Sequence, residues 1–464
     1  MNKLDYEPGS FRDPTARVFY YKDSIYREIF PAGEEKLKFL KEKNLLKDLI
    51  DKNFLIGSEE LKKKHFDFID ENSIVIKHDK LNFISYPYEW TFNELKDAAL
   101  FHLDFQIYLL ERSAQLVDAS AYNVQFRNNK PIFIDLLSID KYREGEYWVA
   151  HKQFCENFLN PLVLTSKKGI NFNNWFRGNL EGISTHELSS ILNLKDLINP
   201  TIFFHVYLLN KIEEKSQKNP NKVTEKIKTS KGLSKNSFRS MLISLKKFIE
   251  SLNLRKQSSI WDQYSTNNSC SKEDERKKIK AVTGFLKKNN FKLLGDLGCN
   301  DGKYSKLATE NNVETVIGFD FDLKVLDRAY LNAKKNSLNF FPLYLDASNP
   351  SGNLGWNDSE RMSFQRRASF DGIFALALTH HLAIAKNIPL NQILSWLVSL
   401  APKGIIEFVP KEDPTTQIML SLKGDIFPQY NEENFEQQLS KLAKIENISV
   451  VSETNRKIYE YKRL

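Results

Sequence analysis

The second half of the chain alternates short apolar runs with segments of helical periodicity. Such alternation predicts a parallel sheet wound with helices on both faces. Two last runs lie close together and are typical of an antiparallel pair at the sheet edge. We expect strands at 292–297, 315–320, 340–346, 370–376 and 404–409, and the edge pair at 448–452 and 457–461. This half is therefore predicted to be a doubly wound, mostly parallel α/β domain.

The first half has a mixed pattern that predicts an α+β domain. Runs at Arg17–Tyr21 and Ser24–Ile29, on both sides of Lys22-Asp23, indicate a β-hairpin. Leu100, Leu103, Ile107 and Leu110 recur at helical spacing and indicate an amphipathic helix. The other elements expected here are a charged helix at 34–50 and strands at 73–77 and 82–86.

Composition limits the class of protein. The 464 residues are 41% hydrophobic and 27% charged, as in ordinary globular proteins. No apolar run approaches the roughly 18 residues that cross a membrane, and Met1–Asp5 does not begin a secretory signal. The three cysteines are too few for a disulfide framework and show no spacing of metal ligands. We expect a cytoplasmic protein with no membrane partner and no metal.

A basic, Ser/Asn-rich stretch separates the two halves. Lys211–Lys280 holds 18 Lys/Arg and 8 Asp/Glu, a surplus of ten, so the rest of the +8 chain is near −2. Helical spacing from Phe238 to Leu252 predicts one amphipathic helix within it. We therefore expect domains at 1–210 and 281–464, with 211–280 as a linker. The linker is either a solvated hinge or a contact for nucleic acid or an acidic partner.

Polar residues gather at the ends of three expected strands. Gly298 and Gly302 allow a sharp turn after Asp296, and Asp320 ends the next strand 24 residues later. A carboxylate there can accept both hydrogens of a ribose diol. Asp346 ends the third strand, where it can accept from an adenine amino group. The acidic turn suits a cationic ligand better than a pyrophosphate, which points to S-adenosylmethionine.

The Asp-x-Gly-x-x-x-Gly turn at 296–302 and the acids that follow it resemble those of class I S-adenosylmethionine-dependent methyltransferases. The resemblance implies that Asp296 lies near the methionine end of the cofactor, Asp320 on the ribose and Asp346 at the adenine edge. The cofactor-binding residues expected on this basis are Asp296, Gly298, Asn300, Gly302, Asp320, Asp346, Ala347 and Ala375.

The residues expected near the methyl acceptor indicate its chemistry less specifically. His380 and His381 follow the fourth strand and are candidates for a catalytic base, or they pack and cap the following helix. Glu407 ends the fifth strand and is either catalytic or a structural hydrogen-bond acceptor. The fourth strand lacks the Asn/Asp-Pro-Pro-Tyr/Phe sequence and a Pro-Cys pair. We expect transfer to oxygen or nitrogen of a small molecule or glycan, with RNA, held by the basic linker, as the alternative.

In the first half, Asp118, Asn123 and Asp135 are spaced like the catalytic and metal-binding loops of protein-kinase-like folds. The resemblance implies a base at Asp118 and magnesium ligands at Asn123 and Asp135. No glycine-rich phosphate loop accompanies them, and Leu136-Leu137 replaces Phe-Gly. A degenerate unit that binds an acceptor or a partner is the preferred interpretation.

Stretches in both halves match a bacterial family of two-part methyltransferases related to NoeA-type nodulation proteins. They include Ser10–Pro14, Tyr86–Trp90, Asp118–Phe126, Asp296–Gly302 and Ala375–Leu382. The likeness spans most of the chain, but it implies no particular acceptor.

Overall fold

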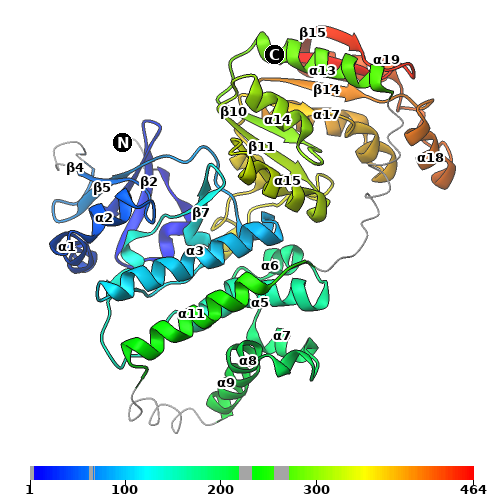
Figure 1. The fold of residues 1–464 in the computed structure, drawn as a ribbon. Helices are drawn as coiled ribbons and strands as arrows, with labels where there is room; N and C mark the ends of the chain where they lie inside the picture. The colour runs from blue at the N-terminus through cyan, green and yellow to red at the C-terminus, as the bar shows by residue number, and fades with distance from the viewer. Residues whose placement is uncertain (1–4, 62–65, 67, 219–231, 255–270) are drawn as a thin grey trace. The chain divides into compact units, whose positions relative to one another are not determined.

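The computed structural model describes residues 5–61, 66, 68–218, 232–254 and 271–464 (Figure 1). Two compact units share the chain. The first comprises Met1–Leu81 and Ser85–Lys256, and the second comprises Asn82–Ile84 and Gln257–Leu464. These boundaries differ from the expected ones, because the stretch 211–280 contributes helices to both units. None of the described helices is long and apolar enough to cross a lipid bilayer.

The first unit begins with a five-stranded antiparallel sheet in the order β1-β2-β3-β5-β4. Its strands are β1 (Asp5–Tyr6), β2 (Ala16–Tyr21), β3 (Ser24–Ile29), β4 (Ser58–Leu61) and β5 (Ile74–His78). The predicted hairpin is confirmed. Lys22 and Asp23 have φ of +45° and +58°, and positive φ at both central residues matches the right-handed twist of the two strands.

Helices and two short strand pairs complete this unit. The pairs are β6 (Ala114–Leu116) with β9 (Ile139–Lys141), and β7 (Val124–Arg127) with β8 (Lys130–Phe133). The helical elements are α1 (Glu34–Glu42), α2 (Leu45–Asp51), α3 (Phe92–Glu111), α4 (His151–Phe154), η7 (Cys155–Leu159), α5 (Asn160–Val163), η8 (Leu164–Lys168), α6 (Asn173–Gly178), α7 (Thr185–Ile191), α8 (Pro200–Ile202), η10 (Phe203–Leu208), α9 (Leu209–Lys218) and α11 (Lys235–Ser251). Of these, η7, η8 and η10 are π-helical.

The amphipathic helix expected in the linker is confirmed as α11, but it belongs to the first unit. It packs against α3 through a buried face that includes Leu242 and Leu245. Lys96 of α3 donates to the carbonyl oxygens of Glu250 and Leu252, at 2.8 and 2.7 Å. The helix therefore covers a core face of the first unit instead of crossing a solvated connector.

Two expectations for the first unit are wrong. The charged helix at 34–50 is two helices, because Asn44 has a left-handed backbone with φ of +52°. The segment 82–86 is not a strand. Its first three residues group with the second unit, where Phe83 stacks on Phe370.

The second unit is built on a seven-stranded sheet in the order β12-β11-β10-β13-β14-β16-β15. The first five strands of this order pair in parallel, and β16 runs antiparallel to both of its neighbours, β14 and β15. Its strands are β10 (Leu293–Leu297), β11 (Thr315–Asp320), β12 (Phe340–Tyr344), β13 (Gly372–Ala375), β14 (Lys403–Phe408), β15 (Ala443–Val450) and β16 (Lys457–Arg463). The predicted α/β fold is confirmed, with the doubly wound order 3-2-1-4-5 for the parallel strands.

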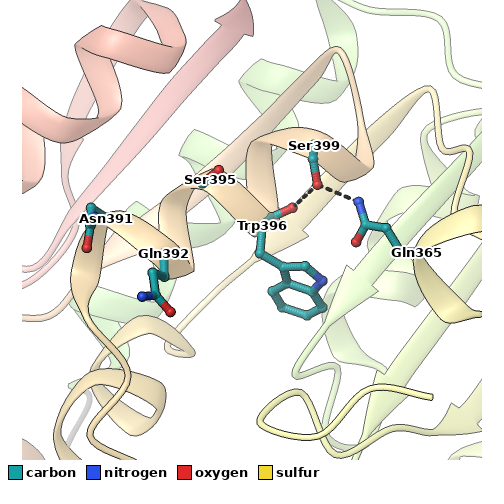
Figure 2. Close-up of a pocket in the computed structure, with 6 residues that line it drawn as sticks. All are labelled: Gln365, Asn391, Gln392, Ser395, Trp396 and Ser399. Carbon is teal, nitrogen blue, oxygen red and sulfur yellow. Dashed lines mark hydrogen bonds between the residues drawn. The ribbon is translucent and has the colours of Figure 1, made fainter. Parts of the chain in front are cut away.

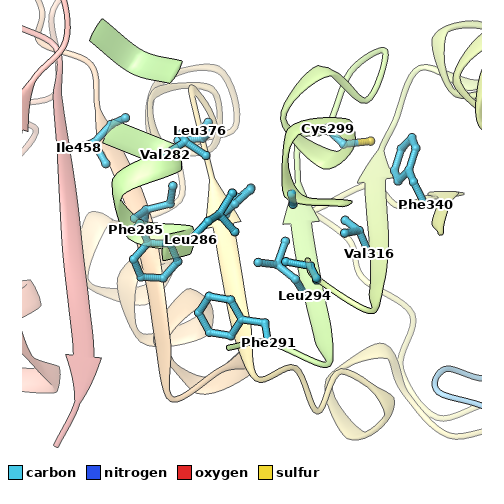
Figure 3. Packing of buried hydrophobic residues seen from close by; sticks show 14 of the residues in the cluster. Val282, Phe285, Leu286, Phe291, Leu294, Cys299, Val316, Phe340, Leu376 and Ile458 are labelled. Atoms are coloured by element: carbon cyan, nitrogen blue, oxygen red, sulfur yellow. The ribbon is translucent and has the colours of Figure 1, made fainter. Parts of the chain in front are cut away.

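Helices cover the two faces of this sheet. The helical elements are α13 (Lys272–Lys287), α14 (Lys303–Glu310), α15 (Leu323–Lys335), α16 (Phe364–Arg367), η12 (His381–Ala385), α17 (Leu390–Leu400), α18 (Pro414–Lys423) and α19 (Glu432–Leu442). Figure 3 shows one core, where Val282, Phe285 and Leu286 of α13 lie with Leu294 and Val316 of the sheet. The part of α13 before residue 281 was expected to be linker, but it forms one helix with the core residues that follow.

Candidate active site

Three residues of left-handed backbone shape the turn that follows β10. Gly298, Asn300 and Gly302 have φ of +80°, +50° and +82°. The N–H groups of Gly298 and Cys299 both donate to the carbonyl oxygen of Phe319, at 2.8 and 3.0 Å. Among residues with a Cβ, Asn tolerates this backbone well. The turn is thus tied to β11, and α14 begins directly after it.

Two of the glycines near the turn accommodate one aromatic ring. A Cβ at Gly302 would lie 2.3 Å from Cε1 of Phe340, and one at Gly318 would lie 2.4 Å from Cε2 of the same ring. Gly298 is different, because the nearest atom to its added Cβ would be 3.7 Å away. The backbone at Gly302 and Gly318 is therefore packed too tightly for a side chain, whereas a Cβ at Gly298 would make only ordinary van der Waals contacts.

Asp296 is a buried carboxylate at the start of the turn. Its Oδ2 accepts a hydrogen bond of 2.6 Å from the Ser305 hydroxyl. Burial raises its pKa to about 7, and the charge of Asp320 adds to this shift, whereas the Ser305 hydrogen bond and Lys278 oppose it. A cation beside this carboxylate would favour its ionised form.

Asp320 lies at the end of the neighbouring strand. Its two oxygens each accept one backbone N–H, from Asn300 at 2.9 Å and from Asp322 at 3.0 Å. Burial raises the pKa of Asp320, and these hydrogen bonds lower it in part. Each carboxylate oxygen can accept more than one hydrogen bond, so both retain capacity for a ligand.

The remaining predicted cofactor residues lie on the next strands of the same sheet. Oδ1 of Asp346 accepts from the Ser348 N–H and hydroxyl, at 2.9 and 2.6 Å. Ala347 follows it and is half-buried. Ala375 is buried at the end of β13, where it pairs with Leu297 of β10. The three acids of the prediction therefore stand at the carboxyl ends of three adjacent strands.

The histidine pair follows β13. The rings of His380 and His381 are 4.2 Å apart between centroids. Burial lowers the pKa of His380 well below its usual value and that of His381 to about 4, with neighbouring cationic groups adding to both shifts. Nδ1 of His380 is buried and has no hydrogen-bond partner. Both rings are neutral at pH 7 and can accept a proton, although they are weaker bases than an exposed histidine.

Glu407, expected at the end of the fifth strand, is completely buried. Its Oε2 accepts from Lys278 Nζ at 2.6 Å and from the Ala377 N–H at 2.8 Å. Arg456 lies 3.9 Å from its other oxygen, which has no hydrogen-bond partner. These contacts correspond to the structural alternative for Glu407, in which it holds the backbone before the histidine pair.

The first unit brings Asp118, Asn123 and Asp135 close together. The Asn123 carbonyl accepts from the Ile134 N–H at 2.9 Å, which sets Asn123 beside the strand end before Asp135. Burial raises the pKa of Asp118, and the charge of Asp135 contributes to the shift. These three residues therefore lie near one another in the first unit.

The carboxylate of Asp135, to which the kinase-like resemblance assigns magnesium, forms an ion pair with an arginine. Nη1 of Arg27, on β3, donates to Oδ1 of Asp135 at 2.7 Å, and the Ser138 hydroxyl donates to Oδ2. Burial alone would raise the pKa of Asp135, but the charge of Arg27 and these hydrogen bonds lower it overall. Arg27 therefore places a positive charge directly on the Asp135 carboxylate.

A surface pocket of the second unit is lined mainly by α17 (Figure 2). Gln365 donates to the Ser399 hydroxyl oxygen at 2.6 Å, and that hydroxyl donates to the Trp396 carbonyl at 2.6 Å. Its lining is Gln365, Asn391, Gln392, Ser395, Trp396 and Ser399. Because it includes none of the acids at the sheet edge, we do not assign it to the cofactor.

Over 458 residues the chain is 42% identical to the nodulation protein NoeA of Rhizobium meliloti (strain 1021), a match that covers 98% of this chain and 95% of that protein. This chain belongs to the NoeA family. The resemblance to NoeA-type proteins that the sequence predicts is thereby confirmed. No family model matches the chain.

Solved structures resemble part of this NoeA-family chain. Magnesium protoporphyrin IX methyltransferase (ChlM) from Synechocystis PCC 6803, with bound SAH, is 19% identical over 45% of this chain and 90% of its own, with a TM-score of 0.31. The N-methyltransferase NodS from Bradyrhizobium japonicum WM9 is 10% identical over 42% and 98%, with a TM-score of 0.31.

Four residues that contact the candidate site residues are not predicted from the sequence. Lys278 lies on α13, whose start is marked by a capping box of Ser271 with Asp274; this Ser-x-x-Asp signal is able to locate the helix. Arg27 lies on β3, a strand that the sequence predicts, but its pairing with Asp135 has no local signal. Ser305 and Arg456 carry no local signal, since only the fold brings them to Asp296 and Glu407.

Proposed function

We propose that this protein transfers a methyl group from S-adenosylmethionine to an oxygen or nitrogen of a small molecule or glycan. The observation that carries the proposal is the row of carboxylates at the carboxyl ends of three adjacent strands. Asp296, Asp320 and Asp346 follow β10, β11 and β12 around the left-handed turn. In doubly wound sheets, ligands bind at this edge.

The residues suit a cationic nucleoside. Asp296 is buried with a raised pKa, so the ammonium of the methionine end would offset the cost of its charge. The carboxylate of Asp320 can accept further hydrogen bonds from the ribose diol. The carboxylate of Asp346 can accept them from the adenine amino group. Gly298, Asn300 and Gly302 would bring the backbone close to the ligand. The cofactor would supply an electrophilic methyl group on its sulfonium.

On the acceptor side, we propose His381 as the base and Glu407 as a positioning residue. Neutral imidazole can take the proton that a hydroxyl or amine loses on methylation. Glu407 holds the N–H of Ala377, which has a left-handed φ of +51°. This contact and the Thr379 hydroxyl, which donates to the Glu407 carbonyl at 2.9 Å, fix the segment that carries His380 and His381.

The acceptor class rests on sequence features and on the name of the relative. The fourth strand lacks the motif of base and amide nitrogen methylation. The relative is a nodulation protein, which supports a glycan or secondary metabolite. An RNA acceptor would instead be revealed by binding that weakens steeply with salt.

Asp320→Ala is expected to weaken binding of S-adenosylhomocysteine by about 1–3 kcal/mol, because buried ribose donors lose their acceptor. This corresponds to roughly a five- to hundredfold rise in Kd. Titration calorimetry on the full chain measures it. Asp425→Ala removes an exposed carboxylate that pairs with Lys411 and should leave Kd unchanged. No heat from the folded wild type would remove the proposed function, and an unchanged Kd in Asp320→Ala would remove the ribose assignment alone.

We further propose that the first unit is a degenerate kinase-like domain. The support is the convergence of Asp118, Asn123 and Asp135 together with the Arg27–Asp135 ion pair. Because Arg27 occupies the carboxylate, magnesium and ATP are expected not to bind. Calorimetry with ATP and Mg²⁺ on the full chain should give no binding heat. Magnesium-dependent ATP binding that Asp135→Ala abolishes would contradict this proposal and indicate a true phosphotransferase.

A further inference from the structure

Two histidines and a cysteine meet in the first unit, outside every site described above. His151 and Cys155 are four residues apart on one helix, so they share a face. His205 comes from another helix, 54 residues after His151. One ligand-type atom from each of the three lies within 4.8 Å of the others.

Two distances within this cluster are close to those between the ligand atoms of a small metal ion. Nε2 of His151 lies 2.8 Å from Nδ1 of His205 and 3.7 Å from Sγ of Cys155. Zinc bonds of about 2.0–2.1 Å to nitrogen and about 2.3 Å to sulfur set tetrahedral edges near 3.3 Å and 3.6 Å. The nitrogen–sulfur distance already matches, and the two nitrogens need to separate by about 0.5 Å, which small rotations of the side chains can supply.

The surroundings also favour a cation. Cys155 is buried, while His151 and His205 are partly accessible, so an ion has a route to the cluster. The carboxylates of Glu156 and Glu213 are close enough to influence the Cys155 thiol, and they also pair with Lys152, at 3.8 and 3.1 Å. Histidine binds metals through its neutral imidazole ring.

The backbone is irregular at both contributing segments. Cys155 begins the π-helix η7, and His205 lies within the π-helix η10. In η7, the Asn160 N–H donates to the Cys155 carbonyl five residues earlier. π-Helical turns are often found at functional sites, and here they lie in both helices that meet at the cluster.

We propose that His151 Nε2, Cys155 Sγ and His205 Nδ1 bind one zinc ion, with the fourth position taken by water or another ligand. The ion ties the helix that begins at His151 to the helix that contains His205. Thiolate and imidazole together suit Zn²⁺ better than Mg²⁺ or Ca²⁺, which prefer oxygen ligands. The proposal is independent of methyl transfer.

Cobalt titration of the full-length protein, stripped with a chelator, tests the site. Co²⁺ is expected to bind once per chain and to show a thiolate-to-cobalt charge-transfer band with strong tetrahedral ligand-field bands. Stoichiometric Zn²⁺ should abolish both. Cys155→Ser should lose the charge-transfer band, and His205→Ala should lose tight binding. Cys299→Ser removes a thiol of the other unit and should keep the full spectrum.

Absence of the charge-transfer band in folded wild type, or its persistence in Cys155→Ser, would overturn the proposed site. The contact between His151 and His205 would then be only a hydrogen bond. Should the variants not fold, the wild type still decides the question. Zn²⁺ should then raise the melting temperature of the wild type with concentration. A melting temperature that does not change with Zn²⁺ would contradict the proposal.

Discussion

Gly302→Ala is expected to destabilise the second unit by about 2–5 kcal/mol. A residue with a Cβ costs about 1–2 kcal/mol in left-handed backbone, and Gly302 has φ of +82°. Its Cβ would lie 2.3 Å from Cε1 of Phe340, and overpacking in a core costs about 1–3 kcal/mol more. Hydrogen exchange of the amides in β10, β11 and β12 measures the loss without interference from the first unit.

Two further variants separate the causes of this loss. Gly284→Ala is the matched control, because its Cβ would have no neighbour within 4 Å and it lies inside α13. It is expected to stabilise by about 0.5–1 kcal/mol. Adding Phe340→Leu to Gly302→Ala removes the ring atoms that clash and should restore part of the protection. Unchanged exchange in Gly302→Ala would show that the turn does not have the backbone described here.

Arg456→Ala is expected to cost about 3–5 kcal/mol, the usual effect of removing one partner from a buried ion pair. Nε and Nη2 of Arg456 donate to the two oxygens of Asp413, at 2.7 and 2.9 Å. Both side chains are almost completely buried. Hydrogen exchange in β14 and β16 is the measurement. Lys411→Ala breaks the more exposed pair with Asp425 and should cost less than about 1 kcal/mol.

The cost of Arg456→Ala should depend on pH. In the wild type, burial tends to raise the pKa of Asp413, but the hydrogen bonds and charge of Arg456 lower it overall. Asp413 therefore stabilises the fold above its unfolded pKa of about 3.9, and this contribution is lost as pH falls through the lower folded pKa. Without Arg456, burial raises the pKa, so stability falls as pH rises. The deficit should be larger at pH 7 than at pH 4, and Asp413→Asn should recover part of it. A deficit that does not change with pH would contradict the assigned pairing.

Elements with strong local signals were predicted well. The strand at 315–320 and the strand Ser24–Ile29 have the predicted bounds. Their apolar runs are bounded by turn residues, and the Lys22-Asp23 turn fixes the hairpin register. β15 was expected to begin at 448 but begins at Ala443, directly after α19. Lys444 and Glu446 are exposed positions in the first half of β15. Because they interrupt the apolar run, the sequence predicts only the second half of this edge strand.

In the candidate site too, some features follow from local sequence and others do not. Asp296, Asp320 and Asp346 were found because parallel strands bring their carboxyl ends to one edge, so position along the chain predicts position in space. Glu407 was placed at the same edge by this reasoning, yet Lys278 and Arg456 enclose it. Whether a strand-end acid is open or enclosed depends on helices and strands distant in sequence, which local patterns do not specify.

By itself, the sequence determined the α/β class, the left-handed turn and the row of acids, because each follows from short-range periodicity or from residues within one strand and its turn. Only the tertiary structure decided which charges are neutralised and which polar groups meet. The Arg27–Asp135 pair spans 108 residues and the His151–His205 contact spans 54. Such pairs form when the chain closes on itself, and burial then sets their charge state, so no local pattern predicts them.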